Sequence, residues 1–231
     1  MKSWDVPMYS SAMAGKLVGL TPTRVRRWLQ GYKYTYISGQ NHVLCKGHKD
    51  PIIYRSDVAD LNFASFLDLI DLLFVKQFLD KGVSLQRTRK ALSEAETLLG
   101  GHHFAQRTFF TNGHNIFIQV KEHGDAILEL LTGGQWVIAP IIKELSQKID
   151  FDRSSGFAQR WYPWGKKSPI VIDPSISFGR PTLVGRGIAT ANVYDLFTAE
   201  NNKSKNVCAW FNLHEDEVNT AVEFERYLLA A

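Results

Sequence analysis

The sequence predicts an α+β protein that is mainly helical, and three observations support this class. Apolar residues recur at intervals of three and four in long stretches, which is typical of amphipathic helices. Short stretches that alternate apolar and polar residues around glycine-containing turns fit β-hairpins. The order of these patterns along the chain predicts three parts, at residues 1–100, 101–160 and 161–231.

Composition places the chain among ordinary globular proteins. It has 231 residues, of which 45% are hydrophobic and 22% charged, so it is too apolar for a disordered chain and long enough for several small cores. No apolar run approaches the roughly 18 residues that cross a membrane, and the first residues lack the apolar segment of a signal peptide. We therefore expect a cytoplasmic protein in which Cys45 and Cys208 are reduced thiols.

Residues 10–31 have the pattern of a helix, a turn and a second, basic helix. Gly19 fits the break between the helices, Thr21 fits the N-cap of the second helix, and Pro22 fits its first position, where a missing amide hydrogen costs nothing. The buried stripe of the second helix is expected to consist of Val25, Trp28 and Leu29. This pattern predicts a helix-turn-helix.

The face opposite that stripe carries polar and basic side chains that suit DNA. Arginine can bind guanine edges in a major groove, and threonine and glutamine can bind bases or phosphates. The predicted DNA-binding residues here are Thr21, Thr23, Arg24, Arg26, Arg27 and Gln30. The alternative is a surface helix pair whose arginines are only solvated.

The distribution of charge favours the DNA-binding interpretation. Residues 1–55 contain nine Lys and Arg against two Asp and Glu, residues 56–167 contain thirteen of each kind, and residues 168–231 contain five against eight. Positive charge concentrated on a small unit is typical of a nucleic-acid binder. The acidic C-terminal part suggests a different role.

Residues 32–49 are expected to form a β-hairpin in the position of a wing. Tyr32, Tyr34 and Tyr36 alternate with polar residues, and Lys33 is placed to reach phosphates. Lys33 and Tyr34 are therefore candidate DNA contacts. The tyrosines fit equally well as a cover for the apolar face of the hairpin.

Two further helices are expected after the hairpin, from residue 63 to Gly82 and from residue 84 to Gly100. The second begins with a basic cluster that contains Arg87, Arg89 and Lys90. A winged helix-turn-helix followed by a helical pair joined at a Gly-Val-Ser turn resembles the MerR family of bacterial transcription regulators. The resemblance implies that the basic cluster contacts the DNA backbone. The chain departs from that family at Gly100, where the helix stops instead of continuing into a long dimerising coiled coil.

The middle part, residues 101–160, mixes short strands and helices. The expected elements are a hairpin at an Asn-Gly turn (residues 112–113), a helix at 125–131, a strand at 136–138 and a last helix at 141–149. Its histidines lack carboxylate partners and are expected at the surface. His42, Cys45 and His48 are spaced by three, but a structural zinc site needs a fourth ligand that nothing nearby supplies. We expect no metal and no cofactor.

The C-terminal part begins in an aromatic segment. Residues 154–168 are rich in glycine, proline and aromatic side chains, which is typical of a boundary between domains. Trp161 and Trp164 are expected to dock onto a neighbouring surface, within the chain or across a dimer. A β-hairpin plus three-helix module follows, with one strand expected from residue 170 to an Asp-Pro turn, a second at 182–184, and helices at 190–200, 204–211 and 214–229.

The C-terminal pattern is a specific one. It reads IDPSISFGRPTLVGRGIAT, ends in VNTAVEFERYL, and resembles the domain, formerly of unknown function, that occurs in VapB-class antitoxins of bacterial toxin-antitoxin pairs. Longer members of that class join a MerR-like head to this tail and pair with a PIN-domain ribonuclease. The resemblance implies an antitoxin that neutralises such a ribonuclease by direct binding and represses its own operon, as a homodimer, by binding operator DNA.

Toxin contacts are expected on the C-terminal part. Its aromatic and acidic side chains could cover the positively charged RNA groove of a nuclease, whereas its two turn arginines fit either turns or partner contacts. The predicted toxin-binding residues are Trp161, Trp164, Arg180, Arg186, Trp210, Phe211, Glu215 and Glu217.

Two other functions remain open. The first is a MerR-like regulator whose C-terminal domain senses a small ligand, with no toxin partner. The second is a metal-dependent enzyme built on the histidines. The chain has no nucleophile elbow, no zinc-protease motif and no phosphate loop, so we expect a protein that is not an enzyme.

Overall fold

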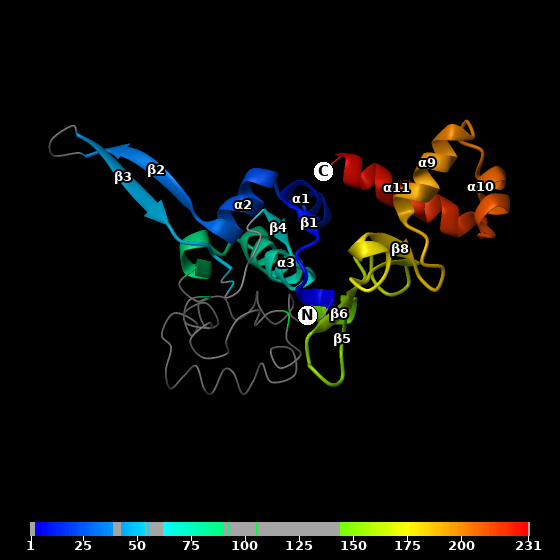
Figure 1. Cartoon of the computed structure of the whole chain (residues 1–231), viewed down its shortest axis with the longest axis horizontal. Helices are drawn as coiled ribbons and strands as arrows, with labels where there is room; N and C mark the ends of the chain where they lie inside the picture. The colour runs from blue at the N-terminus through cyan, green and yellow to red at the C-terminus, as the bar shows by residue number, and fades with distance from the viewer. Residues whose placement is uncertain are drawn as a thin grey trace.

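The computed structural model describes residues 3–38, 43–53, 55, 62–89, 92, 105 and 144–230. The expectations for Lys90 and for the hairpin, helix and strand of the middle part at residues 112–113, 125–131 and 136–138 lie outside the described residues. The described chain is a mixed α and β structure with small sheets (Figure 1).

The N-terminal part is built on two short helices joined by a tight turn. The elements are η1 (Ser3–Asp5), β1 (Tyr9–Ser10), α1 (Ser11–Val18) and α2 (Pro22–Gln30). Gly19 ends α1 in the left-handed conformation with φ 71°, and Thr21 Oγ1 caps α2 by accepting a hydrogen bond from the Arg24 N–H at 3.3 Å. Gly15 lets the turn approach α1, because a Cβ there would lie 2.4 Å from the Leu20 carbonyl oxygen. The expected helix, turn and basic helix are therefore present.

A two-stranded antiparallel ribbon follows α2 and projects from the body of the molecule (Figure 1). In it, β2 (Tyr32–Ile37) pairs with β3 (Leu44–Lys49). The chain then returns to α2, where the backbone N–H groups of Ile52 and Ile53 donate to the Trp28 carbonyl at 2.7 and 3.1 Å. The hairpin expected at residues 32–49 is confirmed for its described strands.

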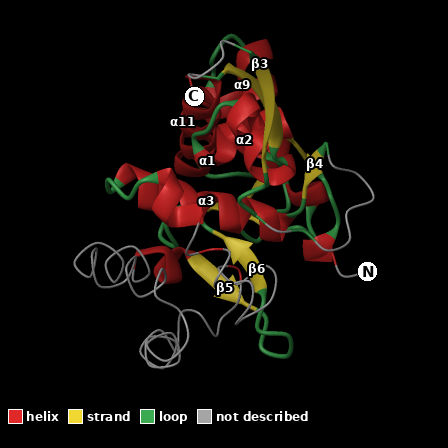
Figure 2. Cartoon of the chain, turned by 90° about the vertical axis from the view of Figure 1, so that its left-hand side faces the viewer, coloured by secondary structure: helices red, strands yellow, loops and turns green. Residues whose placement is uncertain are grey.

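Helix α3 (Phe66–Asp80) is the buried centre of the N-terminal part. It begins at a capping box in which Ser65 Oγ accepts from the Asp68 N–H at 3.1 Å and Asp68 Oδ2 accepts from the Ser65 N–H at 2.8 Å. The expected helix start at residue 63 is wrong, because strand β4 (Phe63–Ala64) pairs with β1 instead. Figure 2 shows α3 between the α1–α2 pair and the sheet described next. A further helix follows α3, and its residues 85–89 are described.

A four-stranded antiparallel sheet joins the end of the middle part to the C-terminal part. Its strands, in order, are β5 (Ile149–Phe151), β6 (Ala158–Trp161), β7 (Ile170–Ile172) and β8 (Pro181–Leu183). Residues 144–148 are helical and Ile149 begins β5, so the last helix of the middle part stops one residue earlier than expected. The boundary expected between residues 160 and 161 falls within β6, whose Trp161 pairs with Ile149 and Ile172.

Three helices complete the C-terminal part. They are α9 (Thr190–Ala199), α10 (Ser204–Phe211) and α11 (Glu215–Ala230), each within one residue of the expected bounds. A 3-10 turn, η3 (Ser177–Gly179), precedes β8. The three helices and β8 enclose a small second core that includes Leu183, Val193, Phe197, Val207 and Val222.

The main core is shared by the N-terminal and C-terminal parts. Buried side chains of α1, α2 and α3 form one cluster with Ile170 and Ile172 of β7 and with Phe224 and Leu228 of α11. Because apolar side chains from both ends of the chain complete the same core, the two parts form a single body.

Candidate nucleic-acid interface and partner surface

Helix α2 presents a basic face to solvent. Val25, Trp28 and Leu29 are buried, with exposed fractions of 0%, 3% and 4%, so the expected apolar stripe faces the core. The exposed side chains of the opposite face are Thr23, Arg24, Arg26 and Arg27. Three arginines therefore reach solvent from one short helix.

Contacts within the chain orient part of this face. The Arg27 guanidinium lies 4.8 Å from the centre of the Tyr32 ring, at the point where the ribbon begins. Gln30 is half-buried, and the Thr21 hydroxyl caps α2. The three arginines are thus the exposed basic donors of the predicted DNA-binding set on α2.

The ribbon has a tyrosine face and a lysine face, because residues directly opposite each other in an antiparallel pair share a face. Tyr32, Tyr34 and Tyr36 lie on one face, with successive ring centres 6.1 and 5.9 Å apart. The Tyr34 ring lies over Gly47, where a Cβ would be 2.4 Å from the ring carbon Cζ. The other face carries Lys33, Thr35, Lys46 and His48. The tyrosines therefore cover one side of the ribbon and leave Lys33 and Lys46 on the other, whereas Lys49 lies opposite Tyr32 on the tyrosine side.

The helix after α3 begins with a basic cluster, and one of its arginines makes hydrogen bonds within the chain. Arg89 donates to the carbonyl oxygens of Asp50 and Pro51 at the end of the ribbon, the latter at 3.1 Å. The Arg89 guanidinium therefore holds the end of the ribbon. Arg87 is exposed.

The aromatic segment docks within the chain, which is the first of the two expected alternatives. Trp161 is 3% exposed and packs in the main core. Trp164 is 39% exposed, and its ring centre lies 5.1 Å from that of Phe224 and 6.2 Å from that of Tyr227, edge-on in both cases. Trp161 therefore offers almost no surface to a partner.

Several candidate partner residues gather where α10 meets α11. Trp210, near the end of α10, is 74% exposed. Glu217, in the first turn of α11, pairs with Arg186 at 3.2 Å and accepts the His214 N–H at 2.8 Å. The backbone hydrogen bond from His214 and the Arg186 guanidinium lower the pKa of Glu217. We call this surface the α10–α11 edge, and it consists of Arg186, Trp210, Phe211, Glu215 and Glu217.

Sequence reasoning missed Phe178, which is 84% exposed. Ser177, Phe178 and Gly179 form a left-handed turn with φ values of 48°, 55° and 69°. The left-handed conformation costs a residue with a side chain about 1–2 kcal/mol. Hydrogen bonds from Tyr9 Oη to the Gly179 carbonyl at 2.9 Å and from Ser177 Oγ to the Gly187 carbonyl at 3.1 Å hold the turn. An aromatic residue inside a Ser-Phe-Gly-Arg-Pro turn is the sequence signal that could have found it.

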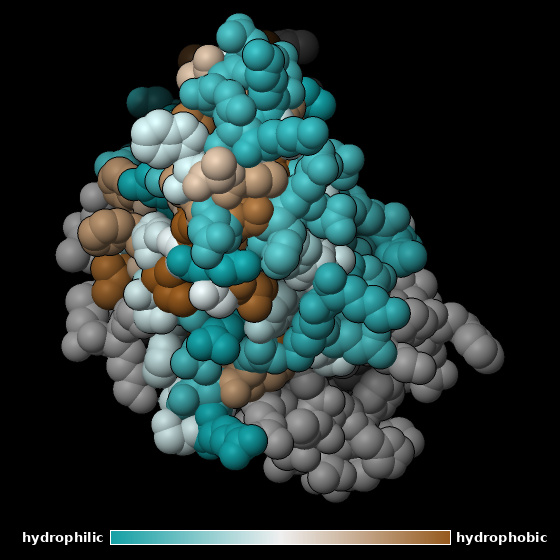
Figure 3. Space-filling view, turned by 90° about the vertical axis from the view of Figure 1, so that its right-hand side faces the viewer, coloured by the Kyte–Doolittle hydropathy of each residue, from teal (hydrophilic) through white to brown (hydrophobic). Residues whose placement is uncertain are grey.

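The surface of the C-terminal part mixes apolar and polar side chains. Figure 3 shows hydrophobic residues surrounded by hydrophilic ones on the side of the molecule that carries α9, α10 and α11. Val184, directly after β8, is 46% exposed, and Arg180, directly after the Phe178 turn, is also exposed. Exposed aromatic and aliphatic groups with a polar rim are the composition of a protein interface.

Among the described residues, no group of His, Cys, Asp and Glu side chains could hold a metal ion. His48 instead pairs with Asp50 at 3.3 Å, Cys45 lies opposite Tyr36 in the ribbon, and His42 lies outside the described residues. A search of the described helices for one long and apolar enough to cross a membrane finds none.

These elements define a mixed α and β protein in which a basic two-helix unit with a ribbon and a three-helix module share one core. No family model matches the sequence. The crystal structure of Rv2018 from Mycobacterium tuberculosis has the same fold, with a TM-score of 0.69 over 95% of this chain and 98% of that chain, at 21% identity. A protein of the same species, strain H37Rv, described as "Putative antitoxin VapB45", is 22% identical over 204 residues, and the match covers 82% of this chain and 82% of that protein.

Proposed function

We propose that the protein is an antitoxin of a bacterial type II toxin-antitoxin pair and acts in the cytoplasm. It binds and neutralises a PIN-domain ribonuclease toxin and represses its own operon as a homodimer on operator DNA. The observation that carries this proposal is the similarity, over 82% of both chains, to a protein whose name is that of an antitoxin. The protein then acts by binding alone, without catalysis or a cofactor.

The proposed DNA contact is the basic face of α2 together with the lysine face of the ribbon. Arg24, Arg26 and Arg27 are exposed on one helix, and arginine is the side chain that most often binds guanine edges bidentately. Lys33 and Lys46 share a ribbon face from which they can reach phosphates. A small head of this kind gains affinity by binding two half-sites as a dimer, which supports the homodimer in the proposal.

The proposed toxin contact is the α10–α11 edge, extended by Phe178, Arg180 and the exposed rim of Trp164. Exposed aromatic side chains are the commonest binding hot spots, and Trp210 and Phe178 are the most exposed large apolar side chains of the C-terminal part that the structure describes. Acidic residues at the start of α11 complement the positive potential that a ribonuclease needs to hold RNA.

Co-expression with the product of the neighbouring gene tests the proposal. The wild-type protein should form a stable complex in affinity purification and permit growth, and Trp210→Ser should weaken the complex and restore growth arrest. Ile37→Ser is the matched control, because it removes a similarly exposed apolar side chain from the ribbon. Deleting residues 168–231 would be a poor test, since it removes β7 and α11 from the main core.

The outcome also separates the proposal from its main competitor. If the wild-type protein forms no complex and the neighbouring gene is harmless to growth, the antitoxin function is wrong. A DNA-binding regulator without a toxin partner would then be the better description.

A further inference from the structure

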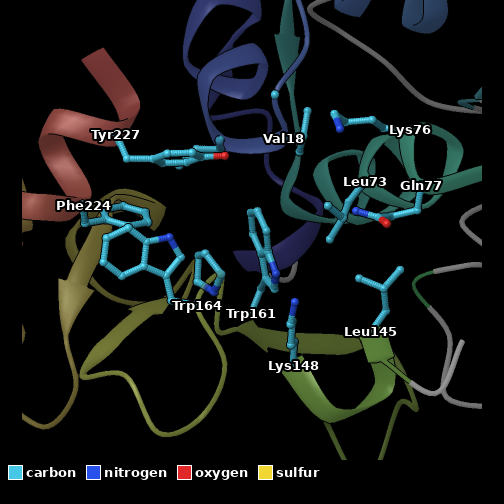
Figure 4. A pocket seen from close by; sticks show the side chains of 13 residues that line it. Val18, Leu73, Lys76, Gln77, Leu145, Lys148, Trp161, Trp164, Phe224 and Tyr227 are labelled. Carbon is cyan, nitrogen blue, oxygen red and sulfur yellow. The ribbon is translucent and has the colours of Figure 1, made fainter. Parts of the chain in front are cut away.

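A pocket of about 150 Å³ lies where the N-terminal and C-terminal parts meet (Figure 4). Its walls come from the end of α1, from α3, from the segment at residues 145–148, from the aromatic segment and from α11. The pocket therefore lies beside the main core that joins the basic head to the C-terminal module. A cavity of about 150 Å³ is large enough to hold one benzene ring.

Aromatic rings dominate one side of this pocket. Trp161, Trp164, Phe224 and Tyr227 all line it, and Trp164 meets Phe224 and Tyr227 edge-on at 5.1 and 6.2 Å. Figure 4 shows Tyr227 extending from α11 and Trp161 rising from the sheet between Trp164 and Leu73. Leu73 closes the side formed by α3. Such walls favour a flat apolar ring.

The polar groups of the pocket are mostly hydrogen-bond donors. The lining includes the ammonium groups of Lys76 and Lys148 and the indole of Trp161, and none of the described residues in it is a carboxylate. Trp161 is 3% exposed, and its indole N–H has no hydrogen-bond acceptor among the described residues. This N–H is not among the fully buried polar atoms that lack a partner in the described chain, so it is accessible from the pocket and can donate to a ligand or to water.

The two lysines keep donors available for a ligand. Lys76 pairs with Asp80, and Lys148 pairs with Glu144 at 2.8 Å. Both carboxylates are about half exposed and lie outside the pocket lining. Because an ammonium group has three donors and an exposed ion pair is weak, each lysine can also bind an anion in the pocket.

We propose that this pocket binds a small carboxylate that carries one aromatic ring. The ring lies against the cluster formed by Trp164, Phe224 and Tyr227, and the carboxylate accepts hydrogen bonds from Lys148 and from the Trp161 indole. The volume limits the ligand to a single ring, and the absence of lining carboxylates among the described residues disfavours a cation. The site is independent of the proposed function, because it stands whether the partner of the C-terminal part is a toxin or not.

Benzoate is the probe that tests this proposal on the full-length protein. Saturation-transfer NMR should detect benzoate binding with a dissociation constant of about 1 mM or below, which is ordinary for a ligand of this size. Benzylammonium has the same ring and the opposite charge, so it should not bind. Lys148→Met keeps the aliphatic stem and should weaken benzoate about tenfold, as loss of a charged hydrogen bond does.

Two further variants keep the test decisive. Trp161→Phe removes the indole N–H, retains a ring and should weaken benzoate binding several-fold, as loss of one hydrogen bond does. Lys166→Met, a charge removal outside the pocket lining, should leave benzoate affinity unchanged. Failure of benzoate to bind, equal binding of benzylammonium, or wild-type affinity in Lys148→Met would each overturn the proposal.

Discussion

Substitution of Gly179 by alanine should destabilise the protein strongly, because its place in the Phe178 turn combines two constraints. Its φ of 69° is in the left-handed region, which costs an alanine about 1–2 kcal/mol. A Cβ there would lie 2.3 Å from Tyr9 Oη and 2.5 Å from Met8 Sδ, and such overpacking costs about 1–3 kcal/mol. Displacing Tyr9 also breaks its 2.9 Å hydrogen bond to the Gly179 carbonyl, a loss of about 1 kcal/mol.

The expected loss in the free energy of unfolding is therefore about 3–6 kcal/mol for Gly179→Ala, measured by urea denaturation. Gly156→Ala is the matched control, since its φ is 76° and nothing lies within 4 Å of the Cβ, so only the backbone cost of about 1–2 kcal/mol applies. Tyr9→Phe alone should cost about 1 kcal/mol. Equal losses in Gly179→Ala and Gly156→Ala would refute the steric argument and, with it, the claim that Tyr9 fixes the Phe178 turn.

Three more predictions concern the two surfaces and pH. Arg26→Ala should weaken binding to operator DNA by about 1–3 kcal/mol in fluorescence anisotropy, whereas Lys203→Ala in the C-terminal part should not; a uniform loss on unrelated DNA would mean that Arg26 contacts only phosphate. Phe178→Ser should weaken the toxin complex at least tenfold without lowering Tm, as loss of an interface anchor does, and an intact complex would remove Phe178 from the interface. Burial raises the pKa of the Glu225 carboxyl above its ordinary value of 4.5, so the folded protein holds this proton to a higher pH than the unfolded chain does. The free energy of unfolding therefore falls as the pH rises from 4.5 through the raised pKa. Glu225→Gln should therefore raise Tm at pH 7 and leave it unchanged at about pH 4, and a gain of equal size at both pH values would contradict the assignment.

Local signals in the sequence were enough to place most of the helices. Thr21, Pro22 and Gly19 act as cap, first residue and stop signal, and each works through backbone groups within a few residues. The C-terminal helices were predicted to within one residue for the same reason. The ribbon was also predictable, because its strands are neighbours in the chain.

Contacts between distant residues were not predictable in this way. Helix α3 starts later than expected because Phe63 belongs to strand β4. This strand pairs with β1, which lies far earlier in the sequence. Trp161 is buried because β6 lies between β5 and β7, a sheet order that no local pattern specifies. The hydrogen bonds of Arg89 were not predictable either, because the carbonyl groups that it binds, in Asp50 and Pro51, lie near it only in the folded chain.

The shared core also determines when the basic head can become rigid during synthesis. Translation produces α1, α2 and the ribbon early, but Phe224 and Leu228, which complete their core, belong to α11 and leave the ribosome much later. A nascent chain that ends before α11 therefore leaves apolar surface of the head exposed and open to chaperones or aggregation. The proposed DNA-binding face would reach its final rigidity only after the C-terminal module has been made, so every chain with a rigid head would already carry the proposed toxin-binding surface.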